Sequence, residues 1–219
     1  MEAIDRFRSR PALRLGVMGG TFDPIHMGHL VTADEALHQF HLDEILFMPT
    51  GTPPHKGQQS ASAETRFLLV SVATSSHPHF WVSRYEIDSR CVDYTVHTLD
   101  FLASELAPDA QLFFITGADA VLDILDWKDP EGILARCTLI GATRPGYDLG
   151  RLSVTLSGLR NRDRVVTMEI PSLAISSSLI RDRVAQGRGA RYLVPDEVTR
   201  LIDKLQLYAD SEHLPQGDR

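Results

Sequence analysis

Short apolar runs alternate with longer stretches of helical periodicity along most of this 219-residue chain. The apolar runs have the length of buried strands and lie at 13–18, 45–48, 80–83, 112–116, 138–142 and 165–170. The intervening stretches repeat apolar residues at the spacing of one helix face, at 29–40, 63–75, 94–106, 176–186 and 195–207. Strands that alternate with helices need crossover connections, which place parallel neighbours in a sheet covered on both faces. The pattern therefore predicts an α/β fold, Rossmann-like and doubly wound, with a mainly parallel sheet.

A chain of this length fits a single domain, which we expect to span residues 1–219. Within it we expect an α/β core over about 13–170 and a small helical C-terminal part over about 171–208. Segment 50–60 contains two prolines and two glycines and is therefore expected to form a loop. Residues 147–164 show no clear pattern, and the tail after Tyr208 is expected to fray.

The composition limits the class of partner. A formal net charge of -7 argues against a broad nucleic-acid-binding surface, yet a few local cations could still bind a small phosphorylated ligand. Cys91 and Cys137 stand far apart, so we expect neither a disulfide framework nor a cysteine zinc site. No apolar signal core opens the chain, and no uncharged apolar run reaches the ~18 residues that span a bilayer. We expect a cytoplasmic protein that binds neither nucleic acid nor a membrane, and a homo-oligomer is compatible with the sequence.

The segment between the first expected strand and the first expected helix reads GGTFDPIHMGH, residues 19–29. Gly19 and Gly20 let the backbone pass close to a phosphate, with amide groups pointing at it. His26 and His29 are three residues apart and share one face at a helix start. Gly28 between them has no side chain, which predicts room for a ligand. Neither a GxxxxGK[ST] loop nor a GxGxxG loop follows the strand, which argues against P-loop NTPases and standard dinucleotide oxidoreductases.

Two other interpretations of this segment stay open on the residues alone. A histidine pair at this spacing could bind a metal, although no third ligand is obvious nearby. The segment could also be a glycine-rich turn that carries two incidental histidines.

A second polar segment, ISSSLIR, occupies residues 175–181. Serines at a helix start offer N-caps and free amide groups, which together favour an anion. Arg181 lies one turn further and could reach the same anion with a bidentate fork. Taken alone, the segment favours an ordinary capped helix with a solvated arginine over an anion site.

The first segment resembles the GxFxPxHxGH signature of the nucleotidyltransferase superfamily, and the second resembles its ISSTxIR element with Ser178 in place of threonine. Serine keeps the hydroxyl group. The resemblance implies that His26, His29 and Arg181 are catalytic and face the phosphates of ATP. It implies an ATP site made of Gly19, Gly20, Thr21, Phe22, His26, His29, Gly117, Asp119, Ser177, Ser178 and Arg181.

Further local matches resemble the nicotinate-mononucleotide adenylyltransferase family, from about residue 13 to residue 208. They are PPHK at 53–56, DYTVHTL at 93–99, GAD at 117–119, Trp127, RPGY at 144–147 and YLVP at 192–195. The resemblance implies a mononucleotide site made of Lys56, Tyr94, Thr95, Asp119, Trp127 and Arg144.

The chemistry of these residues fits that assignment. Lys56 could act as a point charge for a phosphate, although a loop lysine taken alone is more often simply solvated. The amides of Tyr94 and Thr95 at a helix start suit a small carboxylate, or they begin an ordinary capped helix. Trp127 could stack on a pyridine ring or simply pack against the core. Asp119 could bind ribose hydroxyls or cap a helix. Similarly, Arg144 could bind a phosphate or pyridine carboxylate, or form an incidental ion pair.

The family resemblance implies transfer of AMP from ATP to nicotinate mononucleotide, giving deamido-NAD and pyrophosphate in NAD biosynthesis. The attacking phosphate is already anionic, so positioning and charge neutralisation would suffice for catalysis. Mg²⁺ would bridge the phosphates without an all-protein metal site. The alternatives are a related enzyme acting on nicotinamide mononucleotide or phosphopantetheine, and a non-catalytic nucleotide sensor on the same fold.

Overall fold

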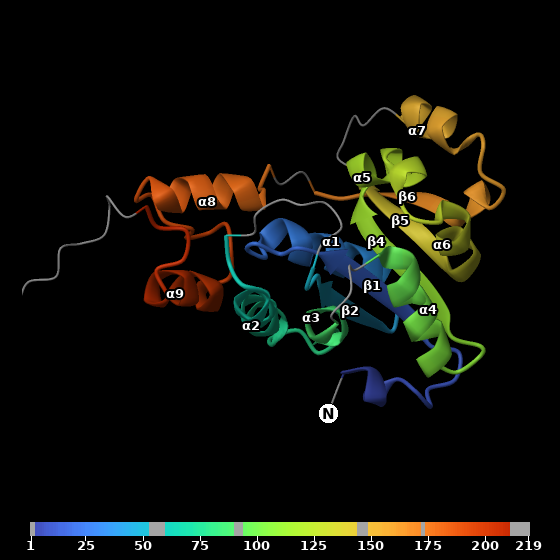
Figure 1. The fold of residues 1–219 in the computed structure, drawn as a ribbon, viewed down its shortest axis with the longest axis horizontal. Helices are drawn as coiled ribbons and strands as arrows, with labels where there is room; N and C mark the ends of the chain where they lie inside the picture. The colour runs from blue at the N-terminus through green and yellow to red at the C-terminus, as the bar shows by residue number, and fades with distance from the viewer. Residues whose placement is uncertain (1–2, 53–59, 90–93, 144–148, 172–173, 211–219) are drawn as a thin grey trace, which may run out of the picture.

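The computed structural model describes residues 3–52, 60–89, 94–143, 149–171 and 174–210 (Figure 1). Six strands form one sheet in the order β3-β2-β1-β4-β5-β6. The strands are β1 (Arg14–Gly20), β2 (Glu44–Pro49), β3 (Phe80–Val82), β4 (Gln111–Gly117), β5 (Cys137–Thr143) and β6 (Val165–Glu169). The predicted α/β class is therefore confirmed.

Every pair of neighbouring strands in this sheet is parallel, so the sheet is more uniform than the mainly parallel one predicted. Leu15 in β1 lies opposite Glu44 in β2 and Leu112 in β4. The chain therefore winds outward from β1 to β3 on one side and from β4 to β6 on the other. In sheets of this kind a ligand crevice lies where the order reverses, beyond the carboxyl ends of β1 and β4.

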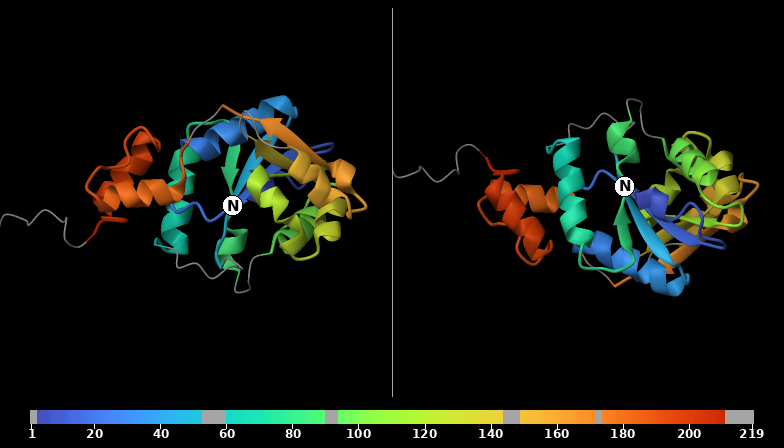
Figure 2. Two further views of the ribbon diagram at one scale, coloured as in Figure 1. Left: turned by 90° about the horizontal axis from the view of Figure 1, so that it is seen from above. Right: turned by 90° about the horizontal axis from the view of Figure 1, so that it is seen from below.

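Helices cover both faces of the sheet (Figures 1 and 2). One face packs against α1 (Met27–Gln39) and α2 (Ala63–Thr74), whose core extends into α8 (Ser177–Ala185) and α9 (Asp196–Lys204). The other face packs against α4 (Thr95–Glu105), α5 (Ala118–Leu122), α6 (Pro130–Arg136) and α7 (Leu149–Leu156). In both views of Figure 2 the orange and red C-terminal helices lie beside α2 at one end of the sheet.

Alternating side chains along the strands supply the two cores. Leu15 and Val17 of β1 point to the α4–α7 face, whereas Met18 points to the α1–α2 face. Because all three are almost fully buried, each contributes roughly 1.5–3 kcal/mol of hydrophobic free energy. This two-sided burial explains why the strands read as continuous apolar runs.

The predicted strands and long helices agree with the structure to within a few residues. Four short helices were not expected: α3 (Tyr85–Asp88), α5, α6 and α7. Each has only one or two turns, too short for apolar residues to repeat at helical spacing. Helix α7 lies within segment 147–164, where the sequence showed no clear pattern. The described residues also include three single turns of 3-10 helix, at Ala3–Arg6, Ile124–Asp126 and Arg162–Arg164.

No helix in the described part of the chain is long and apolar enough to cross a membrane.

Candidate active site

The turn after β1 is held close to the sheet. At Gly19, near the end of β1, a Cβ atom would lie only 3.0 Å from Cζ of Phe114 in the neighbouring strand β4, so the missing side chain leaves room for that ring. Phe22 takes a positive φ of 50° and buries its ring. That ring packs edge-on against His29, with 5.0 Å between ring centroids. Its buried side chain leaves only the backbone of Phe22 to fill the predicted role in the ATP site.

His26 and His29 lie at the start of α1 and stack on each other. Their ring centroids are 3.7 Å apart and the rings are inclined by 24°. The backbone N–H of His26, the N-cap residue, donates to Nδ1 of His29 at 3.2 Å. Because Nδ1 of His29 accepts this bond, the neutral ring carries its proton on Nε2 and can donate from there.

Both rings are poor proton acceptors in the free protein. His26 is 7% exposed, and its Nδ1 has no hydrogen-bond partner in the described structure. Burial lowers the pKa of His26 to about 4. Burial, and then the proximity of His26, lower the pKa of His29 well below its usual value. The pair is therefore neutral near pH 7.

Gly28 lines the cleft and also lies against the ring of His26. A Cβ atom there would lie 3.0 Å from Nδ1 of His26 and 3.1 Å from its Cε1. A side chain there would crowd the His26 ring, so Gly28 permits the histidine stack, and its predicted role of leaving room for a ligand stays a prediction.

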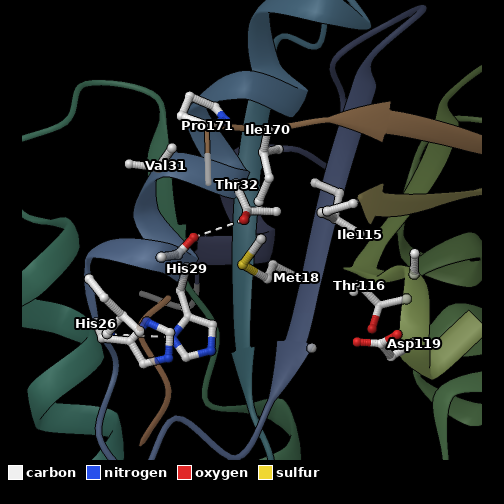
Figure 3. A pocket seen from close by; sticks show the side chains of 16 residues that line it. Met18, His26, His29, Val31, Thr32, Ile115, Thr116, Asp119, Ile170 and Pro171 are labelled. Carbon is white, nitrogen blue, oxygen red and sulfur yellow. Dashed lines mark hydrogen bonds between the residues drawn. The ribbon is translucent and has the colours of Figure 1, made fainter. Parts of the chain in front are cut away.

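A cleft of about 440 Å³ opens at the point where the strand order reverses (Figure 3). His26, His29 and Thr32 line one side of it, and Thr116 and Asp119 face them from the other side. The remaining lining is mostly apolar or glycine: Met18, Gly19, Gly28, Val31, Ile115, Gly117, Ala118, Ala142, Ile170, Pro171 and Ile175. The structure thus brings together Gly19, the histidines, Gly117 and Asp119, as the sequence predicted. The N-cap of α5 is Gly117, so Asp119 is not the helix cap that the sequence allowed as an alternative to a ligand contact.

The ISSSLIR segment docks on the histidine turn. Ser176 is the N-cap of α8 and accepts from the amide of Leu179. Ser177 Oγ donates to the carbonyl of Pro24 at 2.9 Å, and Arg181 donates through Nη1 to the carbonyl of Asp23 at 2.7 Å. Ser177, Ser178 and Arg181 are absent from the described cleft lining, which Ile175 reaches. Their predicted contact with ATP stays a prediction, and the structure adds a second role as supports for the turn.

Two candidates for the mononucleotide site, Tyr94 and Trp127, pack with the core on the α4–α7 face of the sheet. Tyr94 is the N-cap of α4 and Thr95 is its first residue. Nζ of Lys128 lies 4.4 Å from the centroid of the Tyr94 ring, which brings Trp127 and its neighbours close to this helix start. Trp127 is partly buried against the core, edge-on to Phe114 at 6.1 Å, so part of its ring is used in packing. Lys56 and Arg144 lie outside the described residues.

No role was predicted from the sequence for three polar residues near the turn. Asp23 is buried within the first motif, and Tyr208 donates to its carboxylate at 2.8 Å. Arg66, in the first turn of α2, is 1% exposed and donates to the carbonyl of Thr21 at 2.6 Å. Its Nε also donates to the carbonyl of Ala61 at 3.4 Å. An aspartate inside an anion-binding turn and an arginine on an apolar helix face are local conflicts that could have flagged these residues.

This fold, with a stacked histidine pair beside a cleft at the reversal of strand order, is the arrangement of a nucleotidyltransferase. The chain belongs to the cytidylyltransferase-like family, whose model matches residues 17–183. Within it, a probable nicotinate-nucleotide adenylyltransferase of Moorella thermoacetica is 47% identical over 203 residues, 91% of this chain and 93% of that protein. One from Leifsonia xyli subsp. xyli is 49% identical over 201 residues, 92% of this chain and 96% of that protein. At these identities over nearly whole chains, the protein is a member of the nicotinate-nucleotide adenylyltransferases.

A solved structure shares the fold at low sequence identity. The Plasmodium falciparum nicotinic acid mononucleotide adenylyltransferase complexed with NaAD superposes with a TM-score of 0.71 at 18% identity. The match covers 90% of this chain and 97% of that one.

Proposed function

We propose that this protein transfers AMP from ATP to nicotinate mononucleotide, producing deamido-NAD and pyrophosphate. The observation that carries the proposal is the histidine pair at the start of α1, which faces the cleft beside the carboxyl ends of β1 and β4. The names of the relatives support nicotinate mononucleotide as the second substrate.

ATP would bind with its phosphates at the start of α1. The N-terminal end of that helix favours an anion, and His29 offers its Nε2 proton there. Apolar side chains further along the cleft, among them Ile115 and Ile170, form a surface suited to the adenine base. Arg181 would add positive charge from α8 while it holds the turn through the Asp23 carbonyl.

Nicotinate mononucleotide would approach from the α4 side. The start of α4, at Tyr94 and Thr95, would receive the pyridine carboxylate. Lys56 would contact the phosphate, and Asp119 would hydrogen-bond ribose hydroxyls from its place in the cleft lining. The two substrates would then meet at the glycine turn between the faces.

The reaction needs no general base from the protein. An oxygen of the mononucleotide phosphate attacks the α-phosphorus of ATP, a P–O bond forms there, and the bond to the β-phosphate oxygen breaks to release pyrophosphate. The protein would hold the two groups in line and stabilise charge that develops on the phosphate oxygens. His29 is the best-placed donor for this role, because Nδ1 is already engaged with the His26 backbone.

A divalent cation such as Mg²⁺ fits this site mainly through the substrate. Asp119 is the single carboxylate in the described cleft lining, and the described residues contain no cluster of three metal-ligating side chains. Mg²⁺ therefore would enter with the triphosphate, which is its usual mode of binding, and would neutralise phosphate charge.

A turnover assay tests the proposal against its alternatives. Purified protein with ATP, Mg²⁺ and nicotinate mononucleotide should release one pyrophosphate for each deamido-NAD formed. Parallel reactions with nicotinamide mononucleotide and phosphopantetheine test the related enzymes. Binding of ATP without turnover on any acceptor would instead favour a nucleotide sensor.

A further inference from the structure

Asp23 has an unusual position for an acidic residue. It lies in the turn that presents His26, yet it is 5% exposed. A buried carboxylate next to a phosphate site costs desolvation energy and repels the ligand unless donors surround it. Its presence therefore calls for a set of compensating hydrogen bonds.

Those bonds come from two distant parts of the chain. Oδ2 of Asp23 accepts from the amide of Ser60 at 2.7 Å, and Oδ1 accepts from the amide of Ala61 at 3.2 Å. Oδ1 also accepts from the hydroxyl of Tyr208 at 2.8 Å, 185 residues later in the chain. The carboxylate thus fastens the histidine turn to the segment before α2 and to the residues that follow α9.

Tyr208 is suited to be a permanent donor in this cluster. Its ring packs with the core on the α1–α2 face. Burial, then the neighbouring Asp23 carboxylate, raise the pKa of Tyr208 far above its usual value. The hydroxyl therefore stays protonated at any pH at which the enzyme would work.

The C-terminal part contacts the same turn at three further points. Arg181 donates to the carbonyl of Asp23, Ser177 donates to the carbonyl of Pro24, and the amide of Met27 donates to the carbonyl of Leu193. With the Tyr208 bond, donors or acceptors from the C-terminal part meet the chain at three of the five positions from residue 23 to residue 27. Residues 23–27 include the N-cap His26 and lead into the first turn of α1.

We infer that Tyr208 is a positioning residue: through the carboxylate of Asp23 it fixes the turn that aims His26 and His29 at the ATP phosphates. The inference rests on the proposed function. Tyr208 does not line the cleft, so it would act on turnover through Asp23 and not by touching a substrate. A small displacement of catalytic groups can cost a large factor in rate, so loss of this bond should affect kcat.

The test compares Tyr208→Phe with Tyr192→Phe in the full chain. Both remove one hydroxyl from the C-terminal part, but Tyr192 is 83% exposed, whereas Tyr208 packs with the core and donates to Asp23. Tyr208→Phe should lower kcat about 10-fold, the factor that corresponds to one lost hydrogen bond. The KM for the mononucleotide should stay within about 2-fold of wild type. Tyr192→Phe should match wild type in both parameters.

The role of Asp23 is tested by a double-mutant cycle. Asp23→Asn places an uncharged amide in the cluster and weakens its bonds to the backbone amides. If Tyr208 acts through Asp23, the effect of Tyr208→Phe on kcat should shrink at least about 3-fold in the Asp23→Asn background. Equal effects in both backgrounds would contradict the inference.

A second readout separates positioning from stability and from the assigned reaction. Amide hydrogen exchange within residues 22–30 should be faster in Tyr208→Phe than in Tyr192→Phe, at a temperature well below the melting point of either. Unchanged exchange together with unchanged kcat would overturn the inference. If the wild-type protein formed no deamido-NAD, the proposed function would fail, and the exchange comparison would still decide whether Tyr208 orders the turn.

Discussion

The backbone N–H of His26 donates to Nδ1 of His29, and the two rings stack 3.7 Å apart. This bond requires a lone pair on Nδ1, so it selects the tautomer of His29 that donates from Nε2. The stack also disfavours a charge on both rings at once, because like charges at this distance repel. The site therefore offers a neutral, pre-oriented donor to the phosphates.

The first prediction concerns this donor. Replacing His29 with alanine should lower kcat by about 10²–10³, the usual effect of losing one donor that stabilises developing charge. The melting temperature should fall moderately, because the ring borders the cleft but also packs on His26 and Phe22, so kcat is measured well below the melting point of the variant. His38→Ala is the matched control, since His38 is exposed near the other end of the same helix. A His29→Ala variant that kept near-normal kcat would remove His29 from the catalytic role.

The second prediction concerns stability at low pH. The pKa of His26 is about 4 in the folded protein, below the value of about 6.5 expected in the unfolded chain. Between these values the unfolded state binds more protons than the folded state, so the free energy of unfolding rises with pH. This contribution is complete above pH ~6.5 and is lost as pH falls toward 4.

The measurement is urea unfolding of wild type and His26→Gln at several pH values from 4.5 to 7.5, a range set around these pKa values. Wild type should lose more free energy of unfolding than the variant as the pH falls, by up to about 1 kcal/mol for each pH unit. If the free energy of unfolding changed equally with pH in the two proteins, His26 would not have the lowered pKa that its burial predicts.

The third prediction concerns Arg181. Its removal should impair the use of ATP, both by loss of positive charge near the phosphates and by release of the Asp23 carbonyl. Arg181→Ala should lower kcat/KM for ATP at least about 10-fold. Arg183→Ala, on the same helix but bonded to the carbonyl of Gly189, should leave ATP kinetics unchanged. An unchanged kcat/KM for ATP in Arg181→Ala would show that the ISSSLIR segment has no part in the site.

The fourth prediction is selectivity for nicotinate mononucleotide over its amide. The start of α4 presents backbone donors and the positive end of a helix, which favour a carboxylate. A carboxamide there would place its NH₂ against those donors and leave polar groups unpaired, at about 1–3 kcal/mol each. Competition kinetics should therefore give at least about a 10-fold higher kcat/KM for the acid. Equal values would leave adenylyl transfer intact but exclude this account of specificity.

The sheet could be predicted from the sequence because a parallel strand that is buried on both faces appears as a short, continuous run of apolar residues. Strands such as Leu112–Ile115 are apolar on both faces, and the helix between two of them must cross over the sheet. Short helices such as α5 have no comparable residue pattern in the sequence, because their positions are set by tertiary contacts. The same reason explains why segment 147–164 could not be interpreted.

The site could be predicted only in part. The spacing of His26 and His29 indicated that they share a helix face, but not that Gly28 exists to accommodate the His26 ring. Asp23 and Tyr208 meet across 185 residues of sequence, and no local pattern can reveal such a contact. The roles assigned to Lys56 and Arg144, the cytoplasmic location and the oligomeric state stay predictions.

The central claim is that the adenylyl group of ATP, which includes the α-phosphate, is transferred to the phosphate of nicotinate mononucleotide. Reactions with ATP labelled at the α-phosphate or at the γ-phosphate, separated by chromatography, test it directly. The α-label should appear in deamido-NAD and the γ-label in pyrophosphate, with equal yields of the two products. Transfer of the γ-label to the mononucleotide, or recovery of the α-label only in free AMP or unreacted ATP, would contradict the account.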